Sequence, residues 1–340
     1  MRSALLFAVV LFALAPHSAQ ALDFFKKKLP PKAEIHAVKP PEEKKEAVAA
    51  PKAKLPLFRE FTGPAIGEMK EHLTTFEDTL VQLSRDYDIG FVEMRAANPD
   101  IDPWMPGANV KLVIPTMYIL PDAPRRGIVI NLPEMRLYHY GRPETAPESF
   151  PLGVGREGLS TPVGTTAIMS KIEGPVWRPT KRMREEDPTL PEQVPAGPDN
   201  PLGTHAMYLG WPEYRIHGTN KPFGIGRRSS SGCIRMYPED IIRLYPEVPV
   251  GTTVTVVNQP VKAAWIDNQF YIEAHPTIEQ ANVIEENGGA PDYEMSENDM
   301  REILKAAGKD AGLLNWDKIR DIIRTRNGYP VVAATRPGQS

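Results

Sequence analysis

The sequence predicts a mostly β domain over residues 125–260, preceded by a small α+β module and followed by a helical region. Two observations predict this fold class. Short runs of β-branched and aromatic residues, separated by Gly and Pro, occupy residues 125–260, as is typical of strands in β domains. Helical spacing of apolar residues is found instead at 66–116 and after about 275. A chain of 340 residues is long enough for two or three domains of this size.

The first 21 residues have the features of a secretory signal peptide. Arg2 supplies a positive charge, residues 4–15 form an apolar run, and Ala19-Gln20-Ala21 matches the small-x-small cleavage pattern. The alternative is an uncleaved anchor, but the run is short for a bilayer span and Pro16 follows it at once. We therefore expect cleavage after Ala21, export of the chain, and no stable membrane span.

Residues 22–60 are rich in Lys, Glu, Ala and Pro, and two Pro-Pro pairs interrupt any long helix. This composition predicts a semi-extended, solvated linker, with contact to an anionic surface as the alternative. The net charge of the whole chain is -3, and no long basic face stands out. We therefore expect no nucleic-acid partner.

The region 66–116 has the order strand, helix, helix, strand. Apolar residues recur at helical spacing over 80–87, a second helix stops at Asn98-Pro99, and residues 110–115 form a short strand. Together with Asp78-Thr79-Leu80, this order resembles a LysM module, with Glu77 where such modules often carry glycine. The resemblance implies binding to glycans that contain N-acetylglucosamine, such as peptidoglycan. The alternative is a helical spacer without glycan affinity.

Within 125–260 we expect strands at 128–132, 135–140, 150–155, 161–168, 206–209, 214–217 and 252–257. One helix is expected at 238–245, where Pro238 and acidic residues occupy the first turn. The long, Pro-rich stretch 171–203 predicts a lid or cleft wall. Trp177 and Arg178 in that stretch are candidate substrate contacts, with packing as an equal alternative.

The region 276–340 predicts a helical appendage. Ser296 precedes one helix that ends at Gly308, and residues 315–323 form another. No constellation of catalytic side chains is present in this region, so we expect it to lie outside the chemistry.

Cys233 is the single cysteine of the chain and follows Gly232 in a polar surrounding. A free thiol is exposed to oxidation outside the cytoplasm, which favours a chemical use. His217 ends an apolar strand 16 residues earlier and can serve as its base. A zinc site with His205 is one alternative and an inert buried thiol is another. Because no HxH, HExxH or CxxC spacing occurs, we expect no metal and no cofactor.

Two motifs, His217-Gly218-Thr219 and Ser230-Ser231-Gly232-Cys233-Ile234-Arg235, resemble the signature of L,D-transpeptidase catalytic domains (the YkuD-like family). Residues 120–132, 200–203 and 251–254 are similar to its ErfK-type branch. The resemblance implies a β-sandwich-like catalytic domain in which Cys233 is the nucleophile and His217 the general base and acid. It further implies that the Gly218 carbonyl orients His217 and that Gly232 and Ser231 shape the oxyanion region. Many members carry histidine where this chain has Ser231.

The resemblance also implies the reaction. Cys233 would cleave the bond between the diamino acid and D-Ala of a peptidoglycan tetrapeptide stem and pass the acyl group to an amine. The acceptor stays open between a second stem, which gives a 3–3 crosslink, a lysine of an envelope protein, and water. The expected substrate contacts are Arg235, Thr219, Asn220, Trp177 and Arg178. The expected location is the periplasm, at the cell wall; a non-catalytic peptidoglycan-binding scaffold is the alternative from another class.

Overall fold

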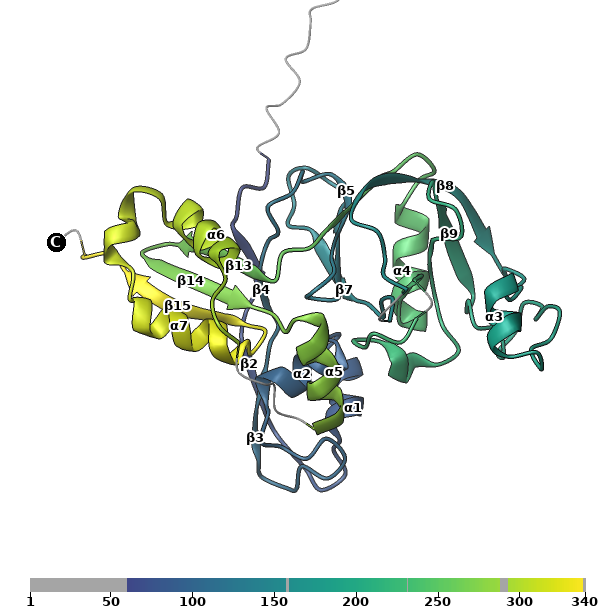
Figure 1. Cartoon of the computed structure of the whole chain (residues 1–340), viewed down its shortest axis with the longest axis horizontal. Coiled ribbons are helices and arrows are strands. Elements are labelled where there is room, and N and C mark those ends of the chain that lie inside the picture. Colours follow the sequence, from purple (N-terminus) through teal and green to yellow (C-terminus); the bar gives the residue numbers. More distant parts are fainter. Residues whose placement is uncertain (1–59, 157–158, 231, 288–292, 339–340) are drawn as a thin grey trace, which may run out of the picture. The chain divides into compact units, whose positions relative to one another are not determined.

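The structure is a computed structural model that describes residues 60–156, 159–230, 232–287 and 293–338. The predicted signal peptide, the predicted linker up to residue 59, and Ser231 lie outside the described residues. All the described residues belong to one unit, which extends over Pro56–Ser340 (Figure 1). Within them, no helix is both long and apolar enough to cross a membrane.

The N-terminal part of this unit has the expected order of elements. They are β1 (Ala65–Gly67), β2 (Lys70–Leu73), α1 (Leu80–Asp86), α2 (Phe91–Ala97), β3 (Lys111–Ile114) and β4 (Met117–Ile119). Strands β2 and β3 pair antiparallel, and the two helices lie between them in the sequence. Helix α1 begins where the Thr79 hydroxyl accepts the Gln82 N–H at 3.1 Å. The strand-helix-helix-strand order is therefore present, and the assignment as a LysM module stays a prediction.

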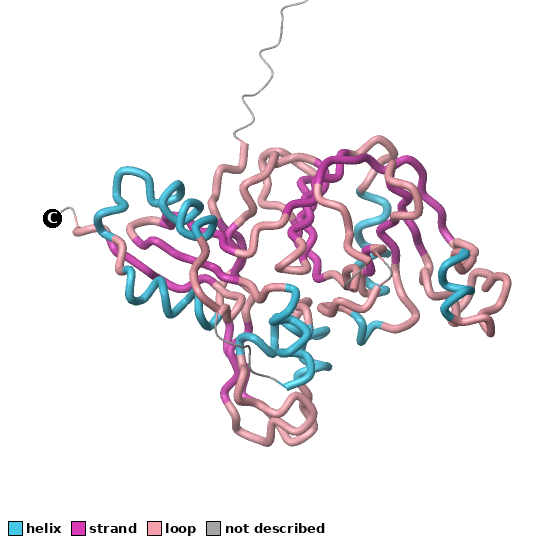
Figure 2. The backbone as a smooth tube through the Cα atoms, viewed as in Figure 1, coloured by secondary structure: helices cyan, strands magenta, loops and turns pink. Residues whose placement is uncertain are grey.

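The central part is a mostly β domain, as expected. Its strands are β5 (Gly127–Asn131), β6 (Arg136–Tyr140), β7 (Glu148–Pro151), β8 (Gly164–Glu173), β9 (His205–Leu209), β10 (Arg215–His217), β11 (Ile234–Arg235) and β12 (Thr253–Val257). They form one sheet in the order β11-β10-β9-β8-β12-β5-β6-β7, drawn in magenta in Figure 2. The first half of β8 pairs with β12 and the second half with β9, with a bulge between Ile168 and Ser170. Strand β8 therefore connects the half of the sheet that contains β12 to the half that contains β9. The bulge bends β8 at this junction.

Helix α4 (Pro238–Glu247) lies where the sequence predicts it and buries Ile241 and Leu244 in the core. A second helix, α3 (Lys181–Glu186), lies in the stretch 171–203, where no helix was expected. None of the six α3 residues is buried, so this helix has no apolar periodicity to reveal it.

The C-terminal part contains the two expected helices, α6 (Glu297–Ala307) and α7 (Trp316–Thr325). It also contains a further helix, α5 (Ile278–Asn287), and a 3₁₀ turn, η2 (Gly308–Leu313). The predicted helical character of 276–340 is confirmed, but this region also contains a strand that the sequence analysis does not predict. Strands β13 (Val261–Ile266), β14 (Gln269–Ala274) and β15 (Pro330–Thr335) form an antiparallel sheet with β14 in the centre. Strand β15 pairs with β14, which lies about sixty residues earlier in the chain. Local sequence patterns do not reveal a pairing between strands so far apart. The region therefore begins at Val261 and is α+β.

One hydrophobic core joins the N-terminal part to the central eight-stranded sheet. Val81 and Phe91 from the N-terminal helices, and Ala281 and Ile284 from α5, belong to the same buried cluster as Ile128 of the sheet. The N-terminal part is therefore packed against the β domain and shares its core.

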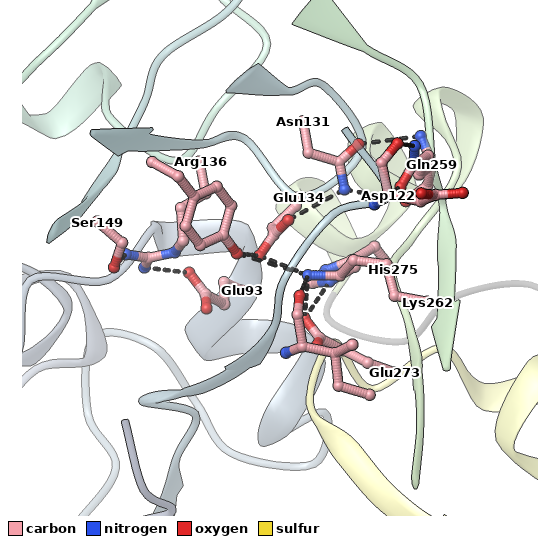
Figure 3. Close-up of polar contacts among 12 residues, drawn as sticks. Glu93, Asp122, Asn131, Glu134, Arg136, Ser149, Gln259, Lys262, Glu273 and His275 are labelled. Atoms are coloured by element: carbon pink, nitrogen blue, oxygen red, sulfur yellow. Dashed lines mark hydrogen bonds and ion pairs between the residues drawn. The ribbon is translucent and has the colours of Figure 1, made fainter. Parts of the chain in front are cut away.

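A buried ionic cluster joins the central sheet to the C-terminal sheet (Figure 3). Lys262 Nζ lies 2.8 Å from Glu134 Oε1 and 2.9 Å from Glu273 Oε1, and His275 Nε2 lies 2.6 Å from Glu273 Oε1. Lys262 also donates to the carbonyl oxygen of Ile119 at 2.6 Å. Burial by itself raises the pKa of Glu134, but the Lys262 ammonium outweighs this and leaves that pKa below its usual value. We call the side chains of Glu134, Lys262, Glu273 and His275 the Lys262 cluster.

Candidate active site

The two motif residues meet because strands β10 and β11 pair in parallel. Ile216 lies opposite Ile234 and His217 opposite Arg235. Cys233 immediately precedes β11 and His217 is the last residue of β10, so the thiol and the imidazole both belong to the edge of the sheet that these two strands form. Both side chains line one cleft of about 490 Å³. The structure therefore brings together two residues that lie 16 positions apart in the sequence.

The turn before Cys233 is fixed by the backbone of Gly232 and by the buried Ser230. Gly232 has φ +102°, and a Cβ at this position would lie 3.1 Å from a ring carbon of Tyr214. Thr161 Oγ1 donates to the Gly232 carbonyl at 2.9 Å, and the Gly232 N–H donates to Ser230 Oγ at 3.2 Å. Both the positive φ and the short distance to the Tyr214 ring therefore favour glycine at position 232. The Gly232 N–H has a partner within the turn in this structure.

The imidazole of His217 is buried and held in one tautomer. Its Nδ1 lies 2.6 Å from the Gly218 carbonyl oxygen, which accepts only from a protonated nitrogen. Nε2 is then the unprotonated nitrogen of the neutral ring. Burial, followed by the nearby Arg235 guanidinium, lowers the pKa of His217 to about 3. At neutral pH the ring is therefore an uncharged proton acceptor.

The Cys233 thiol is half-buried, with Sγ 3.4 Å from the Glu213 carbonyl oxygen. Burial raises the pKa of this thiol, and the Arg215 guanidinium opposes the rise. In the resting protein the same cleft therefore holds a thiol and a neutral imidazole, and the role of His217 as proton acceptor stays a prediction.

The predicted substrate contacts divide into two groups. Arg235, Trp177 and Arg178 line the cleft with Cys233. Thr219 and Asn220 line a different hollow. Thr219 Oγ1 accepts the Lys221 N–H at 3.0 Å, and the Asn220 amide donates to the Asp199 carbonyl at 3.0 Å, so both stabilise the local loop.

Sequence reasoning missed several residues of the cleft. Arg215 stands two positions before His217 on the same strand, and residues at this spacing share a face, so period-two alternation could have found it. The α3 residues Lys181, Arg182 and Met183 also line the cleft, but no apolar pattern marks them.

The zinc alternative finds no support among the described side chains. The His205 ring packs on Tyr245, with centroids 4.5 Å apart, and it is not part of the cleft lining. In the described part of the chain, the group with metal-ligand geometry is Glu134, Glu273 and His275. The Lys262 ammonium already lies within ion-pair distance of both glutamates there.

The family model and the curated relatives name one family. The model of the L,D-transpeptidase catalytic domain, YkuD, matches residues 125–256. The probable L,D-transpeptidase ErfK/SrfK of Salmonella typhimurium is 40% identical over 259 residues, which span 74% of this chain and 82% of that protein. The probable L,D-transpeptidase YbiS of Escherichia coli is 45% identical over 202 residues, spanning 58% of this chain and 66% of that protein. The E. faecium L,D-transpeptidase catalytic domain, solved by NMR, aligns with 40% of this chain and 100% of its own at 22% identity and TM-score 0.32.

Proposed function

Because the chain belongs to the family of L,D-transpeptidase catalytic domains, we propose that it is an exported enzyme that acts on peptidoglycan stem peptides. Enzymes of this family depend on cysteine. The observation that carries the proposal is that Cys233 and His217 line the same cleft. Cys233 is assigned as the nucleophile and His217 as the general base and acid.

In the first half-reaction, the Cys233 thiol gives its proton to His217 Nε2. The sulfur attacks the carbonyl carbon between the diamino acid and D-Ala of a tetrapeptide stem. A C–S bond forms, the C–N bond breaks, and the proton on His217 passes to the amine of the departing D-Ala. The acyl group remains on Cys233 as a thioester. The hydrogen bond from His217 Nδ1 to Gly218 supports this proposal, because it leaves Nε2 as the acceptor.

In the second half-reaction, an amine attacks the thioester carbon. A C–N bond forms, the C–S bond breaks, and the proton lost by the amine returns to sulfur through His217. A stem amine gives a 3–3 crosslink, and a lysine of an envelope protein gives a protein anchored to the wall. Water in place of the amine gives a tripeptide stem. We propose the amine as acceptor and the periplasm, at the cell wall, as the place of reaction.

The backbone of Gly232 and Ser231 is proposed as the oxyanion region, because these two residues directly precede Cys233 in the sequence. Trp177, Arg178 and Arg235 are proposed substrate contacts, since all three line the cleft with Cys233.

The N-terminal part is proposed to bind glycan as a LysM module. Phe76, Trp104 and Met105 support this, since their side chains are 85%, 62% and 78% exposed at the loops of this part. Aromatic side chains exposed in this way can stack on sugar rings. Because this part shares the core of the β domain, deleting it would also damage the catalytic domain. Retention of Phe76→Ala and Trp104→Ala on insoluble peptidoglycan is therefore the better test, and unchanged retention of both variants contradicts the assignment.

The catalytic proposal is tested with purified tetrapeptide muropeptides and mass spectrometry of the products. A 3–3 dimer or a lysine adduct supports transfer to an amine, and tripeptide alone supports a hydrolase. The Cys233→Ala variant should give none of these products while still binding peptidoglycan. Full activity in that variant would show that the nucleophile is wrongly assigned, and no product with the wild type would support a scaffold.

A further inference from the structure

We propose that Arg215 and Arg235 together bind the terminal carboxylate of the D-amino acid that leaves. The pair would thereby select stems that end one residue after the scissile bond. This inference rests on the proposed function and adds to it the residues that decide which stem length is accepted.

The pairing of β10 and β11 places both guanidiniums beside the reacting groups. His217 lies opposite Arg235. One step earlier along the same register, Arg215 on β10 is level with Cys233. Residues two apart on a strand share a face, so all four side chains belong to one face of these two strands. All four line the same cleft.

Among the described residues, neither guanidinium has an acidic partner. Arg215 Nη2 donates to the Glu213 carbonyl oxygen at 3.2 Å, its guanidinium carbon lies 5.3 Å from the Tyr208 ring centre, and its Nε is buried without a hydrogen-bond partner. Arg235 makes no ion pair with a described carboxylate, and burial lowers the pKa of its guanidinium. Unpaired charge in a partly desolvated cleft is costly, and an anionic ligand removes that cost.

The other cationic side chains of this cleft have partners of their own. Lys181 lies 3.7 Å from Glu185, and Arg182 forms an ion pair with Glu186. Arg178 donates to the Gln193 side chain at 2.8 Å. Arg215 and Arg235 therefore differ from the other cationic side chains that line this cleft. Neither guanidinium is bound to a described carboxylate or side-chain amide.

The chemistry of the proposed substrate fits this pair. The terminal carboxylate of the leaving residue lies three covalent bonds beyond the carbonyl carbon that the thiol attacks, within about 4 Å of it. Planar guanidinium groups bind carboxylates through two parallel hydrogen bonds. A stem with one more residue has a neutral amide at this position, which leaves both cations unpaired.

The test compares two synthetic tetrapeptide stems that differ only at the C-terminus, one ending in a carboxylate and the other in a carboxamide. For the wild type we expect kcat/KM to be at least about tenfold higher for the carboxylate. Both arginines also influence the pKa values of Cys233 and His217, so Arg215→Gln and Arg235→Gln can change turnover of both stems. The readout is therefore the ratio of the two kcat/KM values: the carboxylate stem should lose more than the carboxamide stem, and the ratio should approach one in the double variant. Arg156→Gln is the matched control, because Arg156 forms an ion pair with Glu186 and should leave the ratio unchanged.

The outcomes separate this inference from the proposed function. Equal turnover of both stems by the wild type overturns the carboxylate site and leaves the transpeptidase intact. No turnover of either stem overturns the proposed function itself. Circular dichroism and cooperative chemical denaturation report whether each variant is folded. If a variant does not fold, the turnover of the two stems by the wild type still tests whether the site binds a terminal carboxylate.

Discussion

At the residue scale, the electrostatics of the site set the protonation state of the pair. Cys233 and His217 both lose hydration by burial, which favours the neutral form of each. Arg235 adds to this effect on His217, and Arg215 partly reverses it on Cys233. The arginines therefore help to keep the His217 imidazole uncharged. They also offset part of the rise that burial causes in the pKa of the Cys233 thiol.

This state predicts a broad pH profile for kcat/KM. His217 stays neutral at every pH well above 3, so the acid limb should lie below about pH 5 instead of near the usual histidine value of about 6.5. Because Arg235 contributes to the lowered pKa, Arg235→Gln should move the acid limb to higher pH. The measurement is kcat/KM between pH 4 and 9 for both proteins. An acid limb at pH 6–7 in the wild type would contradict the neutral resting pair.

Gly232 provides a second prediction at this scale. In Gly232→Ala the new methyl group meets Tyr214 and the backbone keeps φ +102°, so the turn that positions Cys233 must shift. We expect a loss of about 1–3 kcal/mol in unfolding free energy and a loss of acylation. Gly312→Ala, where a Cβ meets nothing within 4 Å, is the control, with unfolding and thioester formation measured for both. Normal thioester formation in Gly232→Ala would show that the turn tolerates the change.

At the element scale, helix α4 meets helix α1 through charged side chains. Arg85 donates to Glu239 at 2.7 Å, and Arg243 lies 3.1 Å from Asp88 and 3.4 Å from Asp240. Asp240 is almost fully buried, and burial together with the nearby Asp88 raises its pKa to about 8, with Arg243 opposing and Glu239 adding to the rise. Asp240 is therefore protonated in the folded protein at neutral pH and ionised in the unfolded chain.

The stability of this contact is predicted to fall as the pH rises. A folded-state pKa above the unfolded value of 3.8 means that the contribution of Asp240 is complete below about pH 4 and is lost as the pH rises through 8. Asp240→Asn cannot ionise, so the unfolding free energy of the wild type should fall relative to the variant between these limits. Chemical denaturation from pH 5 to pH 9 measures the difference. A constant difference across this range would exclude a shifted Asp240.

At the scale of the whole described unit, the Lys262 cluster fixes the C-terminal sheet to the catalytic domain. Its side chains are at most 2% exposed, and one ammonium lies between two carboxylates. Removing one member of a buried ion cluster leaves uncompensated charge, and this costs more than the loss of a surface pair.

Lys262→Met is therefore expected to destabilise the protein by about 3–5 kcal/mol, measured by chemical denaturation. Lys305→Met is the matched control, because Lys305 pairs with Asp122 at the surface and its loss should cost at most about 1 kcal/mol. Equal effects of the two variants would mean that the cluster is not the main link between the two sheets.

The sequence by itself determined the family, the mostly β fold and the approximate positions of most strands of its central sheet; it predicted 150–155 and 161–168 where β7 and β8 extend over Glu148–Pro151 and Gly164–Glu173, and it did not predict β11. The family follows from two short motifs whose residue types are fixed by chemistry, and the comparisons confirm it. The strands are readable because β-branched runs bounded by Gly and Pro are a local signal. The roles of Cys233 and His217 in catalysis stay predictions for the experiments above.

The tertiary structure alone decided which distant residues meet. Arg215 is level with Cys233 because of the parallel register of β10 and β11. The sequence of either strand alone does not specify the register between them. The C-terminal sheet and the Lys262 cluster likewise depend on pairing between segments far apart in the chain. Local sequence patterns report which element forms, because they arise from neighbouring residues. Contacts between elements arise from packing and charge across the fold, and only the folded chain specifies them.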